Sequence, residues 1–561
     1  MLLRSVHLKN FRAVTSARIS FDLTTALIGE NDCGRSSVME AVALALGWNA
    51  KGREFQFQPF HVHRSPHVPP AEAPSIWIAL EFSESSAGEW GGEDFELLRQ
   101  ALPDVVGRVR RFWLEVTHSG GPATQWAFRA SGGTPRIDDR TLLTWLRRRM
   151  PVFWMAEGMM AGRRGDARPG PLAEGGPQHL ADQVSHHYRD LMEGTALDLS
   201  AAIEGGAAAA RQLLLAGARP LLDRSTPLDE VLEKIAKGGK SRRPRDSAEP
   251  LEGFGTAAHK IGMLLLAGSL LRSGVGQVQR GVDPLTLIEN PEAHLHPMTL
   301  ASIWSVIERI GGQKIVATHS GSLLACARLS SVRRLTRHDG VVKEWRVPDG
   351  TLSADELRRY SYHLRSRRAA ASFARCWLLV EGETEFWLMG ELARVCGYDF
   401  DSEGVTCVEF AQCGLGSLIK VARRLGIEWH LLADGDAAGQ HYRRTACQVA
   451  GAGGVQDRIT LLHDVDLEHC FWRNGYEDVF RAAAYPRNSP VDPATRKRAP
   501  AKAVIARAID RHSKPYLAVL LLDALIDRGP DGVPLGLRSA IETCIRLARR
   551  GSGQGVAGSS G

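Results

Sequence analysis

Long hydrophobic segments are missing from this chain of 561 residues. No apolar run approaches the ~20 residues that a membrane-spanning helix needs. The first residues, Met-Leu-Leu-Arg-Ser-Val-His, also lack the hydrophobic core of a signal peptide. We therefore expect a soluble, cytoplasmic protein that does not contact a membrane.

Cysteine pairs and heptad repeats are missing as well. The nine cysteines are scattered from Cys33 to Cys544 without any Cys-x-x-Cys pair, which favours reduced thiols over disulfides or a zinc site. No long segment has heptad spacing, so coiled-coil arms are not expected. The length predicts two to four domains, and the net charge of +7 permits a polyanionic partner without requiring one.

A glycine loop joins a predicted strand to a predicted helix near the N-terminus. Thr25-Ala-Leu-Ile runs into Gly29-Glu-Asn-Asp-Cys-Gly-Arg-Ser-Ser, and an amphipathic helix is predicted over 38–46. This is Walker A spacing, in which backbone N–H groups at a helix N-terminus hold phosphates. Arg35 replaces the usual lysine, and Ser36 can reach Mg²⁺. The candidate ATP-binding residues of the loop are Gly29, Asn31, Gly34, Arg35, Ser36 and Ser37.

A later apolar strand ends in a candidate Walker B acid. Pro284-Leu-Thr-Leu-Ile leads to Glu289, which is predicted to hold the Mg²⁺ of the nucleotide through water. The segment Glu289-Asn-Pro-Glu-Ala-His-Leu-His-Pro resembles one in OLD-, RecF- and SMC-like ATPases, which have a catalytic glutamate where this chain has Asn290. An amide cannot accept a proton, so we expect hydrolysis to be slowed by ~10²–10⁴ unless Glu292 or His294 substitutes. The same resemblance implies that His319, after the next strand, senses the γ-phosphate.

Two further apolar strands end in carboxylates. Cys376-Trp-Leu-Leu-Val leads to Glu381, and His430-Leu-Leu-Ala leads to Asp434 and Asp436. Because ligands bind beyond the carboxyl ends of parallel strands, these acids are expected to meet at one sheet edge. Glu385, one helical turn after Glu381, is expected to join them. Carboxylates so gathered repel one another unless a cation holds them, and oxygen ligands suit Mg²⁺ or Mn²⁺.

These motifs together resemble those of OLD-family ATP-dependent endonucleases, in particular the bacterial YbjD type. The likeness rests on Glu381 and Asp434-x-Asp436 of a Toprim domain, on Glu289-Asn-Pro-Glu-Ala-His-Leu-His-Pro, and on the segment from Phe373 to Glu385. It covers nearly the whole chain. It implies an α/β fold in which an ABC-type (RecF/SMC-like) ATPase head with a helical insertion is followed by a Toprim domain.

The resemblance also implies roles for later residues. In Leu461-Leu-His-Asp-Val-Asp-Leu-Glu, Asp466 and Glu468 would bind a second metal ion, and Asp464 is either a further ligand or solvated. Lys514, within Ser-Lys-Pro, would lie over the scissile phosphate. The catalytic candidates are then Glu381, Asp434, Asp436 and Lys514, and the metal candidates are Glu381, Glu385, Asp434, Asp436, Asp466, Glu468 and, for the nucleotide, Ser36.

The expected domain order follows the motifs. The two ATPase parts are predicted at 1–155 and 251–368 and the Toprim domain at 369–550. Between the ATPase parts, 156–250 is predicted to be a helical insertion with flexible linkers, either a dimerisation arm or a satellite lobe. Residues 551–561 are predicted to be a disordered tail.

Three functions remain compatible with the sequence. The first is an ATP-regulated, Mg²⁺- or Mn²⁺-dependent DNA endonuclease that forms a homodimer or higher oligomer. The second is a nucleotide-switched, RecF-like DNA-binding or scaffold protein, which Arg35 and Asn290 favour because both weaken the case for ATP turnover. The third is a phage-defence component that needs a partner such as a helicase. No zinc motif of a primase and no obvious tyrosine nucleophile of a topoisomerase is present, so hydrolysis is favoured among Toprim activities.

Overall fold

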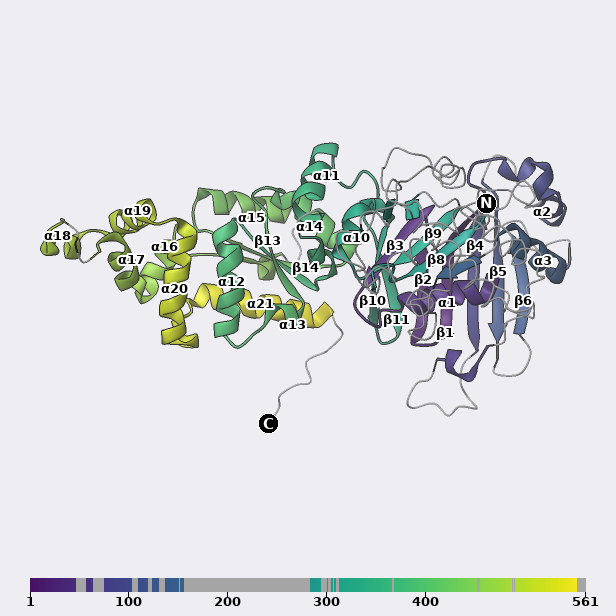
Figure 1. Ribbon diagram of the computed structural model, residues 1–561, viewed down its shortest axis with the longest axis horizontal. Helices are drawn as coiled ribbons and strands as arrows, with labels where there is room; N and C mark the ends of the chain where they lie inside the picture. The colour runs from purple at the N-terminus through teal and green to yellow at the C-terminus, as the bar shows by residue number, and fades with distance from the viewer. Residues whose placement is uncertain are drawn as a thin grey trace, which may run out of the picture. The chain divides into compact units, whose positions relative to one another are not determined.

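The computed structural model of the chain forms two compact units, Met1–Glu344 and Trp345–Gly561, each with its own hydrophobic core (Figure 1). The predicted insertion at 156–250, His294 and nearly all of the predicted tail lie outside the described residues. The residues that the structure describes are 1–46, 57–63, 75–102, 109–119, 124–130, 137–150, 152–155, 283–293, 300, 304–305, 307–308, 312–365, 368–451, 455–486, 488 and 490–551.

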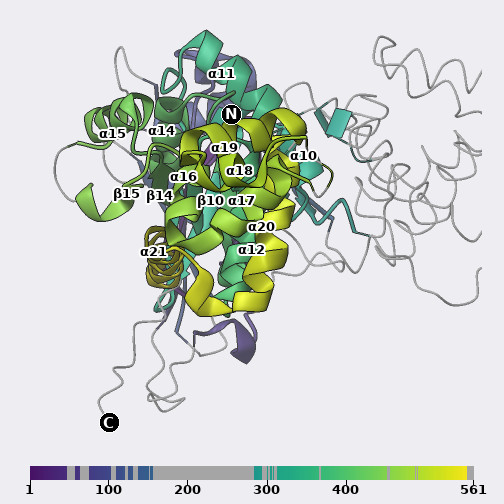
Figure 2. The same cartoon turned by 90° about the vertical axis from the view of Figure 1, so that its left-hand side faces the viewer.

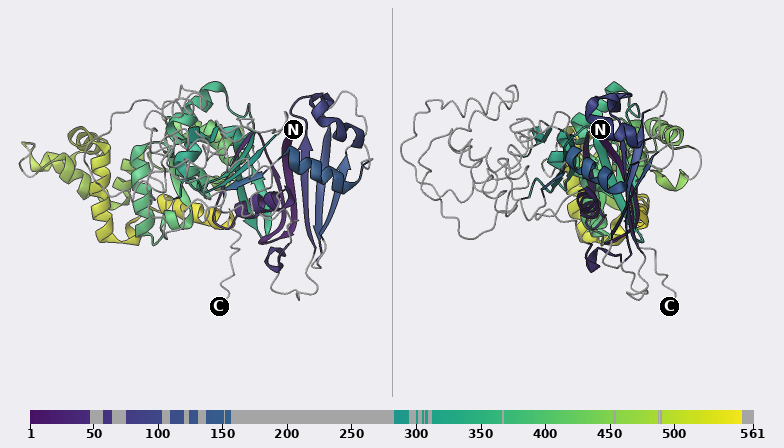
Figure 3. Two further views of the ribbon diagram at one scale, coloured as in Figure 1. Left: turned by 45° about the vertical axis from the view of Figure 1, so that its right-hand side comes forward. Right: turned by 90° about the vertical axis from the view of Figure 1, so that its right-hand side faces the viewer.

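A mixed sheet of eleven strands runs through the first unit, in the order β6-β5-β4-β1-β2-β11-β10-β3-β9-β8-β7. The strands β6, β5, β4, β1 and β2 pair antiparallel, and Figure 3 shows them in purple and blue. The strands β10, β3, β9, β8 and β7 pair parallel. The bounds are β1 Leu2–Phe11, β2 Val14–Ser20, β3 Thr24–Gly29, β4 Ile76–Ser83, β5 Arg111–His118, β6 Thr124–Ala130, β7 Val152–Met155, β8 Leu285–Glu289, β9 Gln313–Ala317, β10 Val332–His338 and β11 Val341–Trp345.

The parallel part of this sheet positions the first candidate site. Every residue of β8 and β9 is buried, as expected for parallel strands with both faces covered. The helix α1, Arg35–Leu46, packs against this part of the sheet, and almost all of its small apolar side chains are buried. The carboxyl ends of β3, β9 and β8 therefore lie next to one another. The other α-helices among the described residues of this unit are α2 Glu96–Ala101, α3 Asp139–Arg149 and α10 Gly321–Cys326.

The second unit contains a four-stranded parallel sheet in the order β13-β12-β14-β15. Its strands are β12 Cys376–Val380, β13 Val405–Glu409, β14 Glu428–Ala433 and β15 Ile459–Leu461. The predicted succession of apolar strand, acid and helix is confirmed at both β12 and β14. Because the strands are parallel, their carboxyl ends share one edge of the sheet.

Helices cover both faces of this second sheet (Figure 2). Those packed on the strands include α12 and α21 on one face and α14 and α15 on the other. The bounds are α11 Ala354–Tyr360, α12 Glu383–Val395, α13 Phe400–Glu403, α14 Leu415–Leu425, α15 Ala437–Ala450, α16 Leu467–Phe471, α17 Glu477–Ala484, α18 Pro493–Arg498, α19 Ala501–Arg511, α20 Lys514–Arg528 and α21 Leu535–Gly551. Among the helices that the structure describes, none has the length and apolar character needed to cross a bilayer.

One buried histidine couples this fold to pH. His430 of β14 is 2% exposed, and its Nε2 atom lies 2.9 Å from Thr460 Oγ1. Burial lowers the pKa of His430 to about 4 from an ordinary value of 6.5, and Arg458 and Arg546 act in the same direction. Between these two pH values, His430 is therefore protonated in the unfolded chain but not in the folded chain. The stability due to neutral His430 is present above the unfolded pKa and is lost as pH falls toward the folded one.

We expect the His430→Gln variant to lose less stability in acid than the wild type. Between about pH 7 and about pH 4, the free energy of unfolding of the wild type should fall by about 3 kcal/mol more than that of the variant. Urea unfolding at several pH values measures this difference. His441→Gln, at an exposed position on α15, is the matched control and should keep the wild-type slope. If the free energy of unfolding had the same pH dependence in His430→Gln and wild type, buried His430 would not be the cause of the loss of stability in acid.

Candidate functional site

The glycine loop lies between β3 and α1, as Walker A spacing requires. Gly29 has a φ of +151°, and a Cβ there would lie 2.4 Å from the carbonyl oxygen of Leu335. Gly34 has a φ of +99°, which side chains rarely adopt. Because α1 begins at Arg35, the unpaired N–H groups of its first turn are directed toward the loop, where they can bind phosphate.

The other candidate residues of the loop divide between surface and interior. Asn31 and Ser36 are exposed, whereas Arg35 and Ser37 are buried. The exposed Ser36 hydroxyl is compatible with its predicted contact with Mg²⁺. The Arg35 side chain is turned toward the end of β9, where Nη1 donates a hydrogen bond to the Thr318 carbonyl oxygen at 2.8 Å.

The candidate Walker B acid lies beside this loop. Glu289 is buried as the last residue of β8, in register with Ala317 of β9. Asn290 follows with a φ of +43°, and its backbone N–H donates to the Ala317 carbonyl oxygen at 2.9 Å. Glu292 Oε1 accepts the backbone N–H of His319 at 2.6 Å. The structure thus brings both acids and the predicted switch histidine to the same strand ends as the loop.

The chemistry of this arrangement fits a Mg²⁺–nucleotide. It combines N–H donors at a helix N-terminus with a hydroxyl at Ser36 and a carboxylate at Glu289. Glu292 supplies a further acceptor, because its Oε2 atom is buried without a hydrogen-bond partner among the described residues. A buried carboxylate oxygen left unpaired is unfavourable, so this position favours a cation or an ordered water.

Glu381 and Glu385 flank the turn between β12 and α12 in the second unit. Glu381 directly follows β12, and the hydroxyl of Tyr442 donates a hydrogen bond to its Oε1 atom at 3.4 Å. Glu385 lies in the first turn of α12, and its Oε2 atom accepts the backbone N–H of Gly382 at 3.1 Å. Both carboxylates are therefore held at the carboxyl end of the central strand.

Asp434 and Asp436 flank a glycine at the end of β14. A Cβ on Gly435 would lie 2.5 Å from the Leu462 carbonyl oxygen, and one on Gly439 would lie 1.8 Å from that of Asp434. Only glycine allows the backbone to approach so closely at both positions. Asp436 caps α15, because its Oδ1 atom accepts the Gly439 N–H at 2.8 Å. The cap fixes the carboxylate beside the strand end.

The late acids lie at the same edge, because β15 pairs with β14. Asp466 caps α16, and its Oδ1 atom also lies 2.6 Å from Nδ1 of His469. Glu468 is buried, and its Oε1 atom lies 3.1 Å from the Nζ atom of Lys514 at the start of α20. The predicted lysine is thereby brought to the predicted second-metal residues.

Two of these acids have raised pKa values, and the other carboxylates contribute to both shifts. Burial raises the pKa of Asp434 to about 8, and the charges of Glu385, Glu381, Asp466 and Glu468 contribute to that rise. The pKa of Glu381 is also raised, by burial first and then by Glu385 and Asp436. Such coupling through a protein requires short separations. The acids predicted to meet are therefore neighbours, and we call this group the acid cluster: Glu381, Glu385, Asp434, Asp436, Asp466 and Glu468.

The acid cluster fits a hard divalent cation by its donor set, although it is not arranged as a finished coordination sphere. Within the described ranges, no group of three or more His, Cys, Asp or Glu side chains stands ready to hold one metal ion. All six donors are nevertheless carboxylates, which Mg²⁺ and Mn²⁺ prefer. The raised pKa of Asp434 indicates excess negative charge that a cation would relieve. Metal binding thus requires these side chains to draw together.

Sequence reasoning missed three neighbours of the acids. Tyr442 reaches Glu381 from α15, and no local pattern indicates this contact. His469 could have been found from its Asp-x-x-His spacing to Asp466 at a helix start. Arg473 pairs with Asp464 at 3.1 Å, and the Asp464 side chain is only 9% exposed, so Asp464 is not simply solvated.

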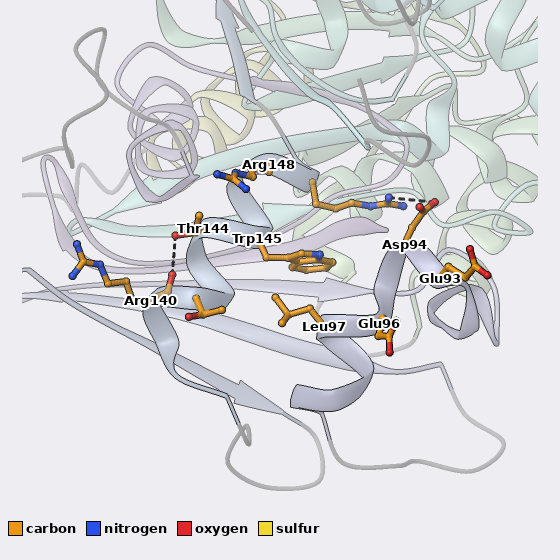
Figure 4. A pocket seen from close by; sticks show the side chains of 10 residues that line it. Glu93, Asp94, Glu96, Leu97, Arg140, Thr144, Trp145 and Arg148 are labelled. Carbon is orange, nitrogen blue, oxygen red and sulfur yellow. Dashed lines mark hydrogen bonds and ion pairs between the residues drawn. The ribbon is translucent and has the colours of Figure 1, made fainter. Parts of the chain in front are cut away.

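A pocket of about 950 Å³ opens elsewhere in the first unit, and none of the candidate residues lines it (Figure 4). It lies between α3 and the segment of α2 and η4, Glu93–Phe95. Trp145 lies between acidic and basic side chains, which include Glu93, Asp94, Glu96, Arg140 and Arg148. The opposed charges offer no net attraction for a phosphate backbone.

Two family models match the chain. One is described as "Protein of unknown function (DUF2813)" and matches residues 1–371, which include the glycine loop, Glu289 and His319. The other, "Overcoming lysogenization defect protein-like, TOPRIM domain", matches residues 373–436, which include Glu381 and Asp434. Together with the observed sheets, these matches confirm the predicted α/β fold class and the predicted Toprim domain in the second unit. The ABC-type ATPase character of the first unit stays a prediction.

Individual proteins resemble the chain to different extents. The "Uncharacterized protein YbjD" of Escherichia coli (strain K12) is 33% identical over 579 residues, which cover 98% of this chain and 99% of that protein. The "Old nuclease" of Escherichia phage P2 is 26% identical over 168 residues, 28% of each protein. Among solved structures, the SMC head domain from Thermotoga maritima matches with a TM-score of 0.31 and 16% identity, over 62% of this chain and 99% of that one.

Proposed function

The chain belongs to the DUF2813 family and carries an OLD-like Toprim domain, and on that basis we propose that it is an ATP-regulated, divalent-metal-dependent DNA endonuclease. The observation that carries the proposal is the convergence of the acid cluster at one sheet edge, beside Lys514. The similarity of the chain to the Old nuclease supports nucleic-acid cleavage as the activity.

The residues of the second unit suit cleavage of a phosphodiester. Divalent cations bound by the acid cluster would supply an activated water and stabilise the leaving oxygen. The ammonium of Lys514 would neutralise charge that grows on the phosphate, while its contact with Glu468 keeps it in place. Tyr442 would orient the Glu381 carboxylate through its hydroxyl.

Incubation of the purified protein with supercoiled plasmid tests the endonuclease proposal directly. In Mg²⁺ or Mn²⁺ we expect nicked and then linear DNA, and in EDTA we expect the plasmid to stay intact, because the proposed reaction needs the bound cation. If neither metal supported cleavage, with or without ATP, the endonuclease proposal would be wrong.

The head is proposed to bind ATP and to use it mainly as a switch. Asn290 cannot serve as a general base, so binding with slow turnover is the expected behaviour. Measuring ATP turnover beside ATP binding in one preparation separates the two. Assembly as a homodimer around nucleotide, a cytoplasmic location, a role in phage defence and a helicase-type partner remain predictions.

A second candidate is a nucleotide-switched DNA-binding protein that does not cleave. The observation in its favour is Arg35, whose guanidinium is engaged by Thr318 and His319 in place of a lysine directed at phosphate. This candidate predicts nucleotide-dependent DNA binding without cleavage under any metal. The plasmid assay therefore decides between the two.

A further inference from the structure

The guanidinium of Arg35 lies inside the nucleotide site of the head. The residue is 7% exposed. Besides its bond to Thr318, its Nη2 atom lies 2.6 Å from Nε2 and 2.9 Å from Nδ1 of His319. A guanidinium has only donors and a neutral imidazole has one acceptor nitrogen, so one of these two contacts at most is a hydrogen bond that the ring accepts.

Cys33 and two carboxylates also surround Arg35, and the Cys33 side chain is hydrogen-bonded to the guanidinium. Glu292 and Glu289 both attract the guanidinium electrostatically. Glu292 also accepts a hydrogen bond from the backbone N–H of His319. The same carboxylate therefore interacts with both Arg35 and His319. Two acids at one site repel each other without a cation. Arg35 therefore supplies a positive charge from within the protein.

A lysine could not hold this arrangement in the same way. Its ammonium is a compact point charge, whereas the guanidinium donates from separate nitrogens to the carbonyl and the imidazole at once. A phosphate that enters the glycine loop must draw Arg35 away from these acceptors. Each hydrogen bond given up in the exchange weakens nucleotide binding by roughly five- to tenfold.

We propose that Arg35 determines the affinity and specificity of the nucleotide site, by holding the empty site closed on His319 and Thr318 and exchanging those contacts for a terminal phosphate. This inference rests on the proposed binding of ATP. A triphosphate places a terminal phosphate beyond the one that a diphosphate offers, and charged oxygens are strong acceptors for a guanidinium. ATP should therefore displace His319 from Arg35 more readily than ADP does.

Equilibrium binding of a non-hydrolysable fluorescent ATP analogue, with Mg²⁺, tests the exchange in four proteins: wild type, Arg35→Lys, His319→Ala and the double variant. Arg35→Lys should tighten binding by about fivefold or more. His319→Ala should tighten binding when Arg35 is present, because the competing acceptor is gone, and should not tighten it when combined with Arg35→Lys. If His319 only contacted the γ-phosphate, His319→Ala would weaken binding of the analogue. Weaker binding by His319→Ala therefore overturns the proposal.

Melting without nucleotide gives an independent readout. Arg35→Lys should lower the melting temperature of the nucleotide-free protein, because Glu289, Glu292 and His319 lose the guanidinium. Arg18→Lys, at an exposed position on β2, is the matched control and should leave it unchanged. An unchanged melting temperature for Arg35→Lys overturns the proposal. If none of the four proteins binds ATP, ATP regulation fails, and melting alone then decides whether Arg35 holds the empty site.

Discussion

Replacement of Glu381 by alanine is expected to lower the rate of metal-dependent DNA cleavage by about 10³-fold. Glu381 directly follows the central strand β12 and lies within electrostatic reach of Glu385 and Asp436. Its loss would remove a proposed metal ligand of the acid cluster, which the remaining carboxylates cannot replace without moving the strand end. Initial rates of plasmid nicking in Mn²⁺ measure the effect.

Two further variants sharpen this test. Glu383→Ala removes an exposed acid two residues away, at the start of the same helix, and should cleave at the wild-type rate. Glu381→Gln keeps the size of the side chain but removes its charge. Equal loss in Glu381→Gln and Glu381→Ala would assign the effect to charge. Wild-type cleavage by Glu381→Ala would contradict the proposed site.

The sequence was sufficient to predict which strands end in the candidate site residues. Apolar runs that end in Glu381, in Asp434 and in Glu289 mark buried parallel strands, and parallel strands present their carboxyl ends at a common edge. The three-residue spacing that makes Asp436 and Asp466 helix caps is also local. Short local patterns of residues are therefore enough to predict the fold class and the sheet edge at which the candidate acids lie.

The sequence could not predict contacts between distant side chains. Arg35 and His319 are far apart in the chain, and nothing near either residue indicates that the guanidinium turns toward the imidazole. Tyr442 reaches Glu381 only because α15 packs on β14, the strand that pairs with β12. The size of the pKa shift at Asp434 likewise depends on burial and on four neighbours brought together by the fold. Such properties arise from tertiary packing.

Substitution of Asp434 by asparagine is expected to have opposite effects on activity and on metal-free stability. Cleavage should fall by ~10²–10³, because an amide is a weaker ligand for a hard cation and carries no charge. In EDTA, however, the variant should be more stable than the wild type in alkaline solution. The cause is the pKa of Asp434, which burial and the surrounding acids raise to about 8 from an ordinary value of 3.8.

The direction of the pH dependence follows from that shift. A carboxyl whose folded pKa is raised contributes stability below its unfolded pKa, and the contribution is lost as pH rises through the folded value. The wild type without metal should therefore lose more free energy of unfolding than Asp434→Asn between about pH 7 and about pH 9, by roughly 1 kcal/mol, since solvent screens a partly exposed group. Urea unfolding in EDTA, with the exposed Asp457→Asn as control, measures the difference.

Divalent metal should reverse this order of stability. A cation bound by the acid cluster stabilises the folded state in proportion to the logarithm of its concentration over its dissociation constant. Mn²⁺ should therefore raise the melting temperature of the wild type and of Asp457→Asn by more than that of Asp434→Asn. If Mn²⁺ raised all three equally, Asp434 would not be a metal ligand. If Asp434→Asn lost both the stabilisation by Mn²⁺ and DNA cleavage, Asp434 would be assigned to the metal site that the cleavage reaction needs.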